Sequence, residues 1–488
     1  MIKSIHSSLI ILGTAILYFA LFWQTGLGLN ILLFSTVCIL LLYFSDAETW
    51  ASLPVRIAAF GTLLTAALIV WHHSLLAIIA HYCSFILLIG FMQHRALRFF
   101  WFGLLLGLQS VFSSPIRLRR VVGKVQEHAP LRVSFRWIRL LFIPLLIGLI
   151  FFFLYYQANA PFAKWISSIW QMSFLYFFEQ LSFYQLFFFL FSLLLATSIF
   201  TKSEHAANKV QQQGEDTIRR GEYKEKIATF KMLSLKTEYQ TALLTLGLLN
   251  SLIMMVIFFD LQFIWMDYSI RSYPELRLFV HQGTYVLIFS ILLAMGILLY
   301  FFRGNLNFFP DNKLVRLLAI IWCVQNGLLA LSVGMRNVQY ILQTGLAYKR
   351  IGVVFFLLLT LFGLWTMVKK IQERKTFTYL LNWNAWAAYG LLLFSALFNW
   401  DLIITQYNIN KASNNAIDTA FLLNTVSDKN LYLLIEKEQY LLQNGNLSTK
   451  ETQFALQGKI DRFQKRQQRQ DWRDWNWIDH RNRNALDR

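Results

Sequence analysis

Residues 351–368 read IGVVFFLLLTLFGLWTMV, an uncharged apolar run that ends at Lys369 and Lys370. It is one of five such runs between residues 241 and 400, and short polar turns separate them. A helix needs about 20 largely apolar residues to cross roughly 30 Å of hydrocarbon. In lipid, every backbone N–H and C=O must be satisfied within its own segment, a condition that a helix meets. This stretch therefore predicts a set of membrane-spanning helices.

The composition of the whole chain indicates the same class of protein. Of its 488 residues, 56% are hydrophobic, 17% aromatic and only 15% charged, and the mean hydropathy is +0.46. A soluble domain carries about 25% charged residues, so an ordinary soluble protein is excluded. The sequence also lacks the alternating segments of about ten residues that build an outer-membrane barrel. We predict an all-α fold, a polytopic integral membrane helix bundle.

Length and apolarity predict about twelve spans. They lie at residues 7–24, 27–44, 54–72, 74–92, 97–113, 138–156, 185–201, 241–264, 282–302, 314–334, 351–368 and 382–399. Twelve spans place both termini on the outer side. A miscount of one span within residues 1–113 would move the N-terminus to the inner side and leave the C-terminus outside.

The distribution of Lys and Arg orients these spans. Basic residues collect in the loops 114–137, 202–240 and 369–380, and they are sparse in the loops 157–184 and 265–280. Short loops rich in Lys and Arg stay on the cytoplasmic side. The first three loops are therefore predicted to be cytoplasmic, and the chain after residue 400 extracytoplasmic.

These features divide the chain into four regions. Residues 1–113 hold N-terminal transmembrane helices, and residues 114–240 hold transmembrane helices with basic cytoplasmic loops and an aromatic outer loop. Residues 241–400 are the core transmembrane region, and residues 401–488 form a helical extracytoplasmic tail. The aromatic loop, residues 157–184, is expected to lie at the membrane interface as a helix or to re-enter the membrane.

Capping signals predict the helices of the tail. Ser448-Thr449-Lys450-Glu451 is a capping box, which predicts a helix from there to Gln470. Ser427 is an N-cap candidate for a second helix. Three tryptophans close the chain, and we expect them to dock the tail on the helical region or on the membrane surface; they are Trp472, Trp475 and Trp477.

The net charge of +19 indicates a preference for anionic lipid. Most of the excess flanks the predicted spans, where each Lys or Arg near an anionic membrane surface contributes about 1 kcal/mol. The sequence contains no recognisable nucleic-acid-binding module, so nucleic acid is the weaker interpretation of this charge and is not among the partners that we predict. The partners that we expect are the lipid bilayer and other envelope proteins, which the tail or the loop 202–240 would contact.

The sequence contains none of the common catalytic motifs. The sequence has no Walker A loop, GxGxxG, HExxH, GxSxG or kinase motif set, so no catalytic residue is predicted and enzymatic activity is left open. His72, His73 and His81 bracket one turn and are the only set with any resemblance to a haem or metal site. Their spacing specifies no ligand geometry, so no metal and no cofactor is predicted.

One polar constellation emerges once the topology is applied. The last five spans bring charged or polar residues to one outer level, namely Asp260, His281, Arg336, Asn337, Lys349, Arg350 and Asp401. Gln325 and Asn326 lie deeper on the tenth span and extend the polar track inward.

Charged groups near membrane depth are costly, so they usually pair or line a wet cavity. Three interpretations follow: an ion-paired clamp that fixes helix packing, a binding or translocation site, or a site of chemistry. We expect both carboxylates, Asp260 and Asp401, to lie close to Arg336 and Arg350 in one connected network.

The run from Thr241 to Asn410 resembles a family. The matching residues are Tyr285 to Met295, Phe302-Arg303-Gly304-Asn305, Gln325-Asn326, Gly345 to Gly352, Asn399-Trp400-Asp401 and Tyr407-Asn408. Over residues 241–410 the chain resembles the bacterial polytopic membrane proteins of the domain-of-unknown-function 4173 group. The resemblance implies a multi-pass protein of the bacterial cytoplasmic (inner) membrane and transfers no activity. Gln282 and Asn337 stand where this family commonly has an acidic residue, which argues against an acid–base role there.

Two classes of function remain. One is a multi-pass inner-membrane protein that serves as an envelope scaffold or signalling accessory. The other is a transporter or lipid-handling protein that uses the outer polar constellation. The sequence shows no inverted repeat of broken helices, which lowers the expectation of a transporter.

Overall fold

The computed structural model describes nine segments of the chain. They are residues 2–127, 183–202, 206–211, 216–218, 225–260, 288–303, 305–310, 312–411 and 417–487. Their regular elements are all helical, and the only extended pairings in these segments are two isolated bridges. The all-helical fold predicted from the sequence is confirmed for this part of the chain.

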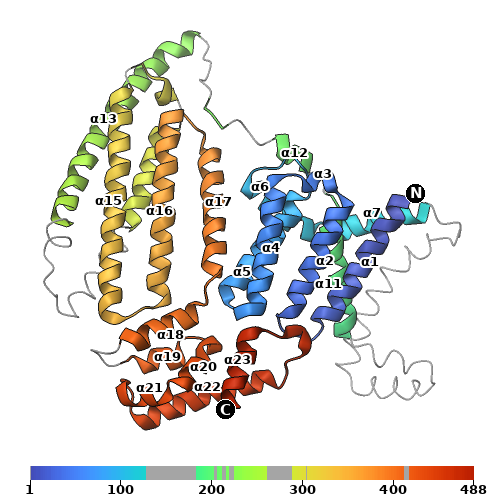
Figure 1. The fold of residues 1–488 in the computed structure, drawn as a ribbon. Coiled ribbons are helices and arrows are strands. Elements are labelled where there is room, and N and C mark those ends of the chain that lie inside the picture. Colours follow the sequence, from blue (N-terminus) through green and yellow to red (C-terminus); the bar gives the residue numbers. More distant parts are fainter. Residues whose placement is uncertain are drawn as a thin grey trace, which may run out of the picture.

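The helices form two bundles and a smaller domain (Figure 1). The N-terminal bundle contains α1 (Ile2–Phe22), α2 (Leu29–Ser45), α3 (Ala47–Trp50), α4 (Leu53–His72), α5 (Leu75–Phe91), α6 (Phe100–Phe112), α7 (Ser114–Glu127), α11 (Phe183–Phe200) and α12 (Ala206–Gln211). The second bundle contains α13 (Glu225–Asp260), the helix Ile288–Phe301, η2 (Asn305–Phe308), α15 (Lys313–Thr344), α16 (Tyr348–Glu373) and α17 (Phe377–Ala396).

The smaller domain, called the tail domain below, covers both bundles at one end (Figure 1). It contains α18 (Trp400–Lys411), α19 (Thr419–Asn424), η3 (Asp428–Asn430), α20 (Leu431–Glu436), α21 (Glu438–Asn444), α22 (Thr449–Gln467), η4 (Trp472–Asp474) and α23 (Trp477–Leu486).

Four helices in the described segments are long and apolar enough to cross a membrane. They are Leu53–His72, Leu235–Asp260, Lys313–Thr344 and Tyr348–Glu373, and a fifth span results if α17 and α18, which meet at an angle of 61°, count as one. Shorter apolar helices occupy most of the other predicted spans. The predicted span at 138–156 lies outside the described residues, so the count of about twelve remains a prediction.

The N-terminal bundle is packed through small residues. A Cβ atom on Gly90 of α5 would lie 1.8 Å from the carbonyl oxygen of Gly103 in α6, and one on Gly107 would lie 2.1 Å from that of Ile86. Backbones this close leave no room for a side chain, as is common where helices associate in membranes. Glycine at these positions therefore sets the contact between α5 and α6.

The helix α17 joins the two bundles. Along the chain it follows α16 and packs against it, yet Ala385 and Tyr389 belong to the apolar core of the N-terminal bundle. The Tyr389 hydroxyl donates to Ser84 Oγ at 2.9 Å, and Asn382 Oδ1 accepts from the backbone N–H of Phe100 at 2.8 Å. The two bundles therefore share one helix.

The described parts of the basic loops lie at the end of the molecule opposite the tail domain, called the loop end below (Figure 1). There the segment 216–218 pairs with the turn after α16: Ile218 N–H donates to Arg374 O at 2.8 Å, and Thr376 N–H donates to Asp216 O at 2.8 Å. Lys202 also pairs with Asp46 there, at 2.5 Å. The structure thus separates these basic segments from the tail domain by the full length of the helices.

The helix α6 begins and ends near the loop end. At its start, Phe100 bonds to Asn382, close to the first residue of α17. Just after its end, Arg117 donates to Thr201 O at 2.6 Å, one residue beyond α11. A helix of 13 residues is about 20 Å long, which is shorter than the hydrocarbon of a bilayer.

The tail domain has an apolar core of its own, which includes Leu431, Leu434, Leu456 and Phe463. The predicted capping box at Ser448 and Glu451 is confirmed, because each side chain accepts from the other residue's backbone N–H. Ser427 also caps as predicted, accepting from Lys429 N–H at 3.2 Å. The sequence therefore predicted where these helices begin, whereas α22 ends at Gln467 rather than Gln470.

Two of the three closing tryptophans dock the tail domain on the N-terminal bundle. The Trp477 ring stacks on Trp71 of α4 with centroids 5.9 Å apart. The Trp475 carbonyl accepts from Leu29 N–H at 3.1 Å, at the start of α2. Trp472 is 61% exposed.

Candidate functional site

The first part of the predicted polar constellation is a buried ion pair between α13 and α15. Arg336 Nη2 lies 2.5 Å from Asp260 Oδ1, and Ser332 Oγ donates to Asp260 Oδ2 at 2.6 Å. Asp260 is 9% exposed and Arg336 is 5% exposed. The carboxylate ends α13, so the pair fixes the last turn of that helix against the middle of α15.

The second part holds the turn between α15 and α16. Asn337 Nδ2 donates to Arg350 O at 3.0 Å, which ties α15 to the first turn of α16. The Arg350 guanidinium lies 4.4 Å from the ring centroid of Tyr340 and donates to the carbonyl of Gly345. Lys349 points to the surface and is exposed. Arg350 therefore serves the turn rather than a carboxylate.

The third part surrounds Asp401 in α18, which is 8% exposed. The Tyr348 hydroxyl donates to Asp401 Oδ1, and Ser427 Oγ donates to Oδ2 at 2.8 Å. Among the described residues, no Lys or Arg nitrogen lies within 4.0 Å of this carboxylate. The expectation that Asp401 pairs with Arg336 or Arg350 is corrected accordingly, because two hydroxyls satisfy it.

Sequence reasoning missed three residues of this arrangement: Ser332, Tyr348 and Ser427. Ser332 lies one helical turn before Arg336, a spacing that places both side chains on one face of α15. Tyr348 lies inside the Gly345–Gly352 motif, where the basic residues drew attention instead. Ser427 was expected only to cap a helix, and it also reaches Asp401.

The deeper polar residues join α13 to α15. Gln325 Nε2 donates to Asn250 O at 3.4 Å, and Asn250 Nδ2 donates to Leu318 O at 3.2 Å. Asn326 bonds to the backbone of its own helix, at Trp322 O. All of these side chains are buried, so they contribute hydrogen bonds between helices rather than an open polar track.

His281 and Gln282 lie outside the described residues. The three N-terminal histidines do not converge: His72 contacts Ala396 O at 3.1 Å, His73 contacts Asn476 at 3.3 Å, and His81 lies near Ser35 and Thr65. In the described part of the chain, no group of three or more His, Cys, Asp or Glu side chains has the arrangement of a metal site.

The arrangement as a whole is one of closed contacts. Asp260 and Asp401 each accept from two donors. The donors to Asp260 both come from α15, and those to Asp401 come from α16 and from the tail domain. Both carboxylates are also buried, so a soluble ligand has little access to them. These contacts hold α13 to α15 and the tail domain to α16.

A family model described as "Domain of unknown function (DUF4153)" matches residues 49–436. The chain belongs to this family. No curated protein and no solved structure matches the chain. The match to the DUF4153 family contains both buried carboxylates with their partners, and it ends before α22, η4 and α23.

Proposed function

We propose that this DUF4153 protein is a multi-pass protein of the bacterial inner membrane that holds its tail domain rigidly at the outer face, as an envelope scaffold or signalling accessory. The observation that supports this best is Asp401, whose two oxygens accept from Tyr348 of α16 and Ser427 of the tail domain. The carboxylate joins a transmembrane helix to the domain that it presents.

The proposed orientation rests on charge and on the placement of the chain ends. The basic segments lie at the loop end, which is cytoplasmic by the positive-inside rule. Helix α1 ends near the tail domain, since Arg473 donates to Ala20 O at 2.6 Å, so its N-terminus lies at the loop end. If α6 does not cross, the miscounted early span is 97–113. The two termini then lie on opposite sides of the membrane, with the C-terminus outside.

The surfaces proposed for partners are the tail domain and the loop 202–240. We also propose that residues 241–410 are related to the domain-of-unknown-function 4173 group. The inner membrane is the proposed location of the protein. A scaffold needs one fixed arrangement more than it needs an open cavity, and the closed contacts around Asp260 and Asp401 are of that kind.

A specific observation favours lipid handling as the second candidate. An apolar cavity of about 460 Å³ lies between α5, α16 and α17. Its lining includes Leu76, Gly352, Phe355, Leu392 and Trp400. A cavity with this lining and volume suits an acyl chain.

Docking of the tail domain can be tested with Ser427→Ala in the full-length protein. The change leaves one Asp401 oxygen without its donor, which costs about 1–3 kcal/mol for a buried group. We expect faster protease cleavage between residues 437 and 447 in right-side-out vesicles. Ser251→Ala, an exposed serine on α13, is the matched control. Unchanged cleavage of Ser427→Ala would contradict the role given to Asp401.

The two candidate functions separate on a cavity-filling variant. A Cβ atom on Gly352 meets no atom within 4 Å, so Gly352→Leu fills the apolar cavity without a backbone clash. Gly390→Leu, on α17 and equally open, is the control. If the protein is a scaffold, Gly352→Leu complements a deletion strain, whereas Ser427→Ala complements poorly. The reverse result would favour lipid handling.

A further inference from the structure

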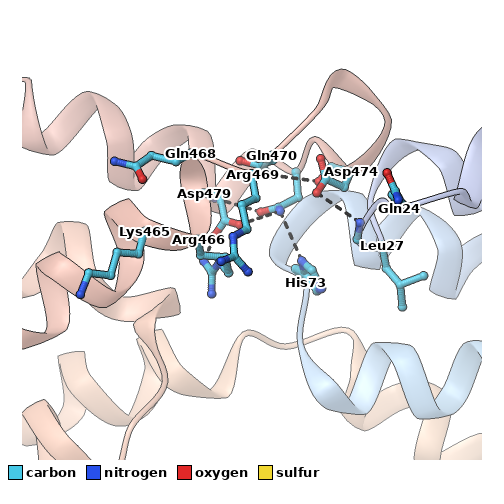
Figure 2. Close-up of a pocket in the computed structure, with 12 residues that line it drawn as sticks. Gln24, Leu27, His73, Lys465, Arg466, Gln468, Arg469, Gln470, Asp474 and Asp479 are labelled. Carbon is cyan, nitrogen blue, oxygen red and sulfur yellow. Dashed lines mark hydrogen bonds and ion pairs between the residues drawn. The ribbon is translucent and has the colours of Figure 1, made fainter. Parts of the chain in front are cut away.

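A second cavity, of about 560 Å³, lies where the tail domain meets the N-terminal bundle. The turn between α1 and α2 and the end of α4 form one wall, and α22, η4 and α23 form the other. Figure 2 shows the side chains of Arg466, from α22, and Arg469, just beyond that helix, on the side of the cavity that faces His73. Unlike the cavity between α5, α16 and α17, this one is lined mainly by charged and amide side chains.

The wall formed by the bundle is conformationally strained. Three non-glycine residues of the described chain have positive φ, and two of them, Gln24 (φ 54°) and His73 (φ 46°), line this cavity. Such conformations cost free energy and persist where the surrounding structure enforces them, often at functional sites. Both residues lie in turns that the tail domain contacts.

The contact that closes the cavity is made by backbone. A Cβ atom on Gly28 would lie 2.3 Å from the carbonyl carbon of Asp474, so only glycine fits there. Gly26 N–H donates to Asp474 Oδ2 at 3.3 Å, and Asp471 N–H donates to Asp474 Oδ1 at 2.7 Å. Both oxygens of the Asp474 carboxylate are therefore occupied by backbone donors.

The tail domain is basic in its last 30 residues, the part that contributes to this cavity. Residues 401–458 contain four Lys and Arg against six Asp and Glu, whereas residues 459–488 contain nine against five. Basic residues in the last turn of a helix are favoured by its dipole, which accounts for Lys465 and Arg466. Arg469 lies beyond the last residue of α22 and still extends into the cavity (Figure 2).

The cations of the cavity differ in their partners. Arg466 is neutralised by Asp428 and by Asp479, the latter at 3.0 Å. Lys429 also pairs with Asp479 at 3.0 Å, and these two cations hold the pKa of that carboxyl below its ordinary value despite its burial. Among the described residues, Lys465 and Arg469 have no carboxylate within ion-pair distance. The cavity thus contains two cations without an internal counter-ion.

His73 adds a neutral donor. Burial is the main cause that lowers the pKa of His73, and nearby Lys429 lowers it further, so the imidazole is neutral. Asn476 Nδ2 lies 3.3 Å from His73 Nδ1 and also 2.8 Å from Asp479 Oδ2, which identifies that nitrogen as a donor. An amide that donates to Nδ1 requires the ring proton on Nε2. His73 Nε2–H is then a donor that no described acceptor uses.

Four exposed tryptophans belong to the same end of the molecule: Trp71, Trp472, Trp475 and Trp477. Tryptophan prefers the headgroup level of a membrane because its ring is apolar and its N–H can hydrogen-bond. The turns that form the cavity wall also connect the ends of apolar helices, α1 to α2 and α4 to α5. The cavity therefore opens at the level where lipid headgroups lie if the helices span the membrane.

We propose that this cavity binds the phosphate of an anionic phospholipid headgroup, with Arg469 as its charged ligand and Lys465, whose ammonium points away from Arg469 (Figure 2), as a second positive charge at the rim. A guanidinium binds phosphate through two parallel N–H···O bonds, and an ammonium adds a point charge. Gln24, Gln468 and His73 supply further side chains that can bond to headgroup oxygens. This inference needs the membrane placement of the helices but not the role proposed for Asp401.

The test uses the full-length protein in detergent and native mass spectrometry. Phosphatidylglycerol and phosphatidylcholine with identical acyl chains are titrated onto wild type, Arg469→Gln and Arg462→Gln. Arg462 is an exposed arginine of α22 that does not line the cavity, so its variant matches the change in charge. We expect phosphatidylglycerol to bind about tenfold more weakly to Arg469→Gln, the effect of one lost charged contact. We expect Arg462→Gln to stay within about twofold.

Three results would overturn the proposal. Equal binding of both lipids to wild type would show no preference for an anionic headgroup. Equal losses in the two variants would show that the lipid responds to overall charge and not to the cavity. Displacement of phosphatidylglycerol by sn-glycerol 1-phosphate at equal concentration would assign the cavity to a soluble phosphate ester. Gly352→Leu, which fills the apolar cavity between α5, α16 and α17, should bind phosphatidylglycerol like wild type, which keeps this test separate from that of lipid handling.

Discussion

Two polar regions of the molecule use the same residue types in opposite ways. At Asp260 and Asp401, each carboxylate is buried and both of its oxygens are bonded. In the cavity between the tail domain and the N-terminal bundle, Arg469 and Lys465 lie at an open surface and lack a carboxylate partner in the described structure. The comparison teaches that partners and burial, more than the presence of charge, separate a structural contact from a candidate binding site.

The largest effect expected from this comparison concerns the buried ion pair. Arg336→Met leaves Asp260 charged and buried without its cation, and breaking such a pair costs about 3–5 kcal/mol. We expect a lower yield of folded protein and a lower melting temperature in detergent. Asp260→Asn combined with Arg336→Met should recover part of the loss. A double variant less stable than Arg336→Met would contradict the pairing.

A smaller effect is expected where the tail domain contacts the bundle by backbone. Gly28→Ala places a methyl group against Asp474, and overpacking of this kind costs about 1–3 kcal/mol. We expect faster proteolysis around residues 469–473 and weaker retention of phosphatidylglycerol in the same variant. Gly13→Ala in α1, where a Cβ meets no atom within 4 Å, is the control. If Gly28→Ala changes neither readout, the cavity does not depend on this contact.

Lys459 of the tail domain shares features with both polar regions. It is buried like the paired carboxylates, but its partners are backbone carbonyls and not a group of opposite charge. It donates to Leu422 O at 3.1 Å and Val426 O at 3.0 Å, and burial lowers its pKa to about 8 from 10.5. Between these values the unfolded chain binds more protons than the folded chain, so stability rises with pH across this window. The rise is on the order of 1–3 kcal/mol, and Lys459→Met should abolish it. Hydrogen exchange of the tail domain in the full-length protein, followed from pH 8 to 10.5, measures both.

The smallest effect is expected at the cavity itself. Arg469→Gln in lipid-free detergent should change the melting temperature very little, because exposed substitutions usually stay within about 0.5 kcal/mol. The same variant loses lipid binding, so stability and binding separate at this residue. A large destabilisation without lipid would instead make Arg469 part of the packing and remove the distinction between the two polar regions.

The sequence predicted the positions of helices better than the partners of side chains. Apolar runs and caps follow from local chemistry, which is why α4, α15 and α16 and the capping box at Ser448 were predictable. The pairing of Asp260 with Arg336 was also predictable, because a charged side chain at membrane depth is costly unless an opposite charge lies beside it.

The partners of Asp401 could not be predicted in the same way. Charge matching pointed to arginine, while the structure supplies two hydroxyls, one of them from Ser427, which the sequence indicated only as a helix cap. The cavity between the tail domain and the N-terminal bundle could not be predicted from the sequence, for a related reason. Its walls come from segments about 400 residues apart, and its shape depends on the backbone of Gly28 and Asp474.

The shared helix α17 has a consequence for how the protein is made. The Tyr389 hydroxyl lies where Gly61 leaves space, since a Cβ there would be 2.1 Å away, and it bonds to Ser84. A chain emerging from the ribosome inserts α4 and α5 long before it reaches α17. Until then this slot is empty and Ser84 lacks that partner. The earliest helices therefore depend for their completion on a segment synthesised some 300 residues later, and a chain truncated before Phe377 would present an unfinished core to the quality-control proteases of the membrane.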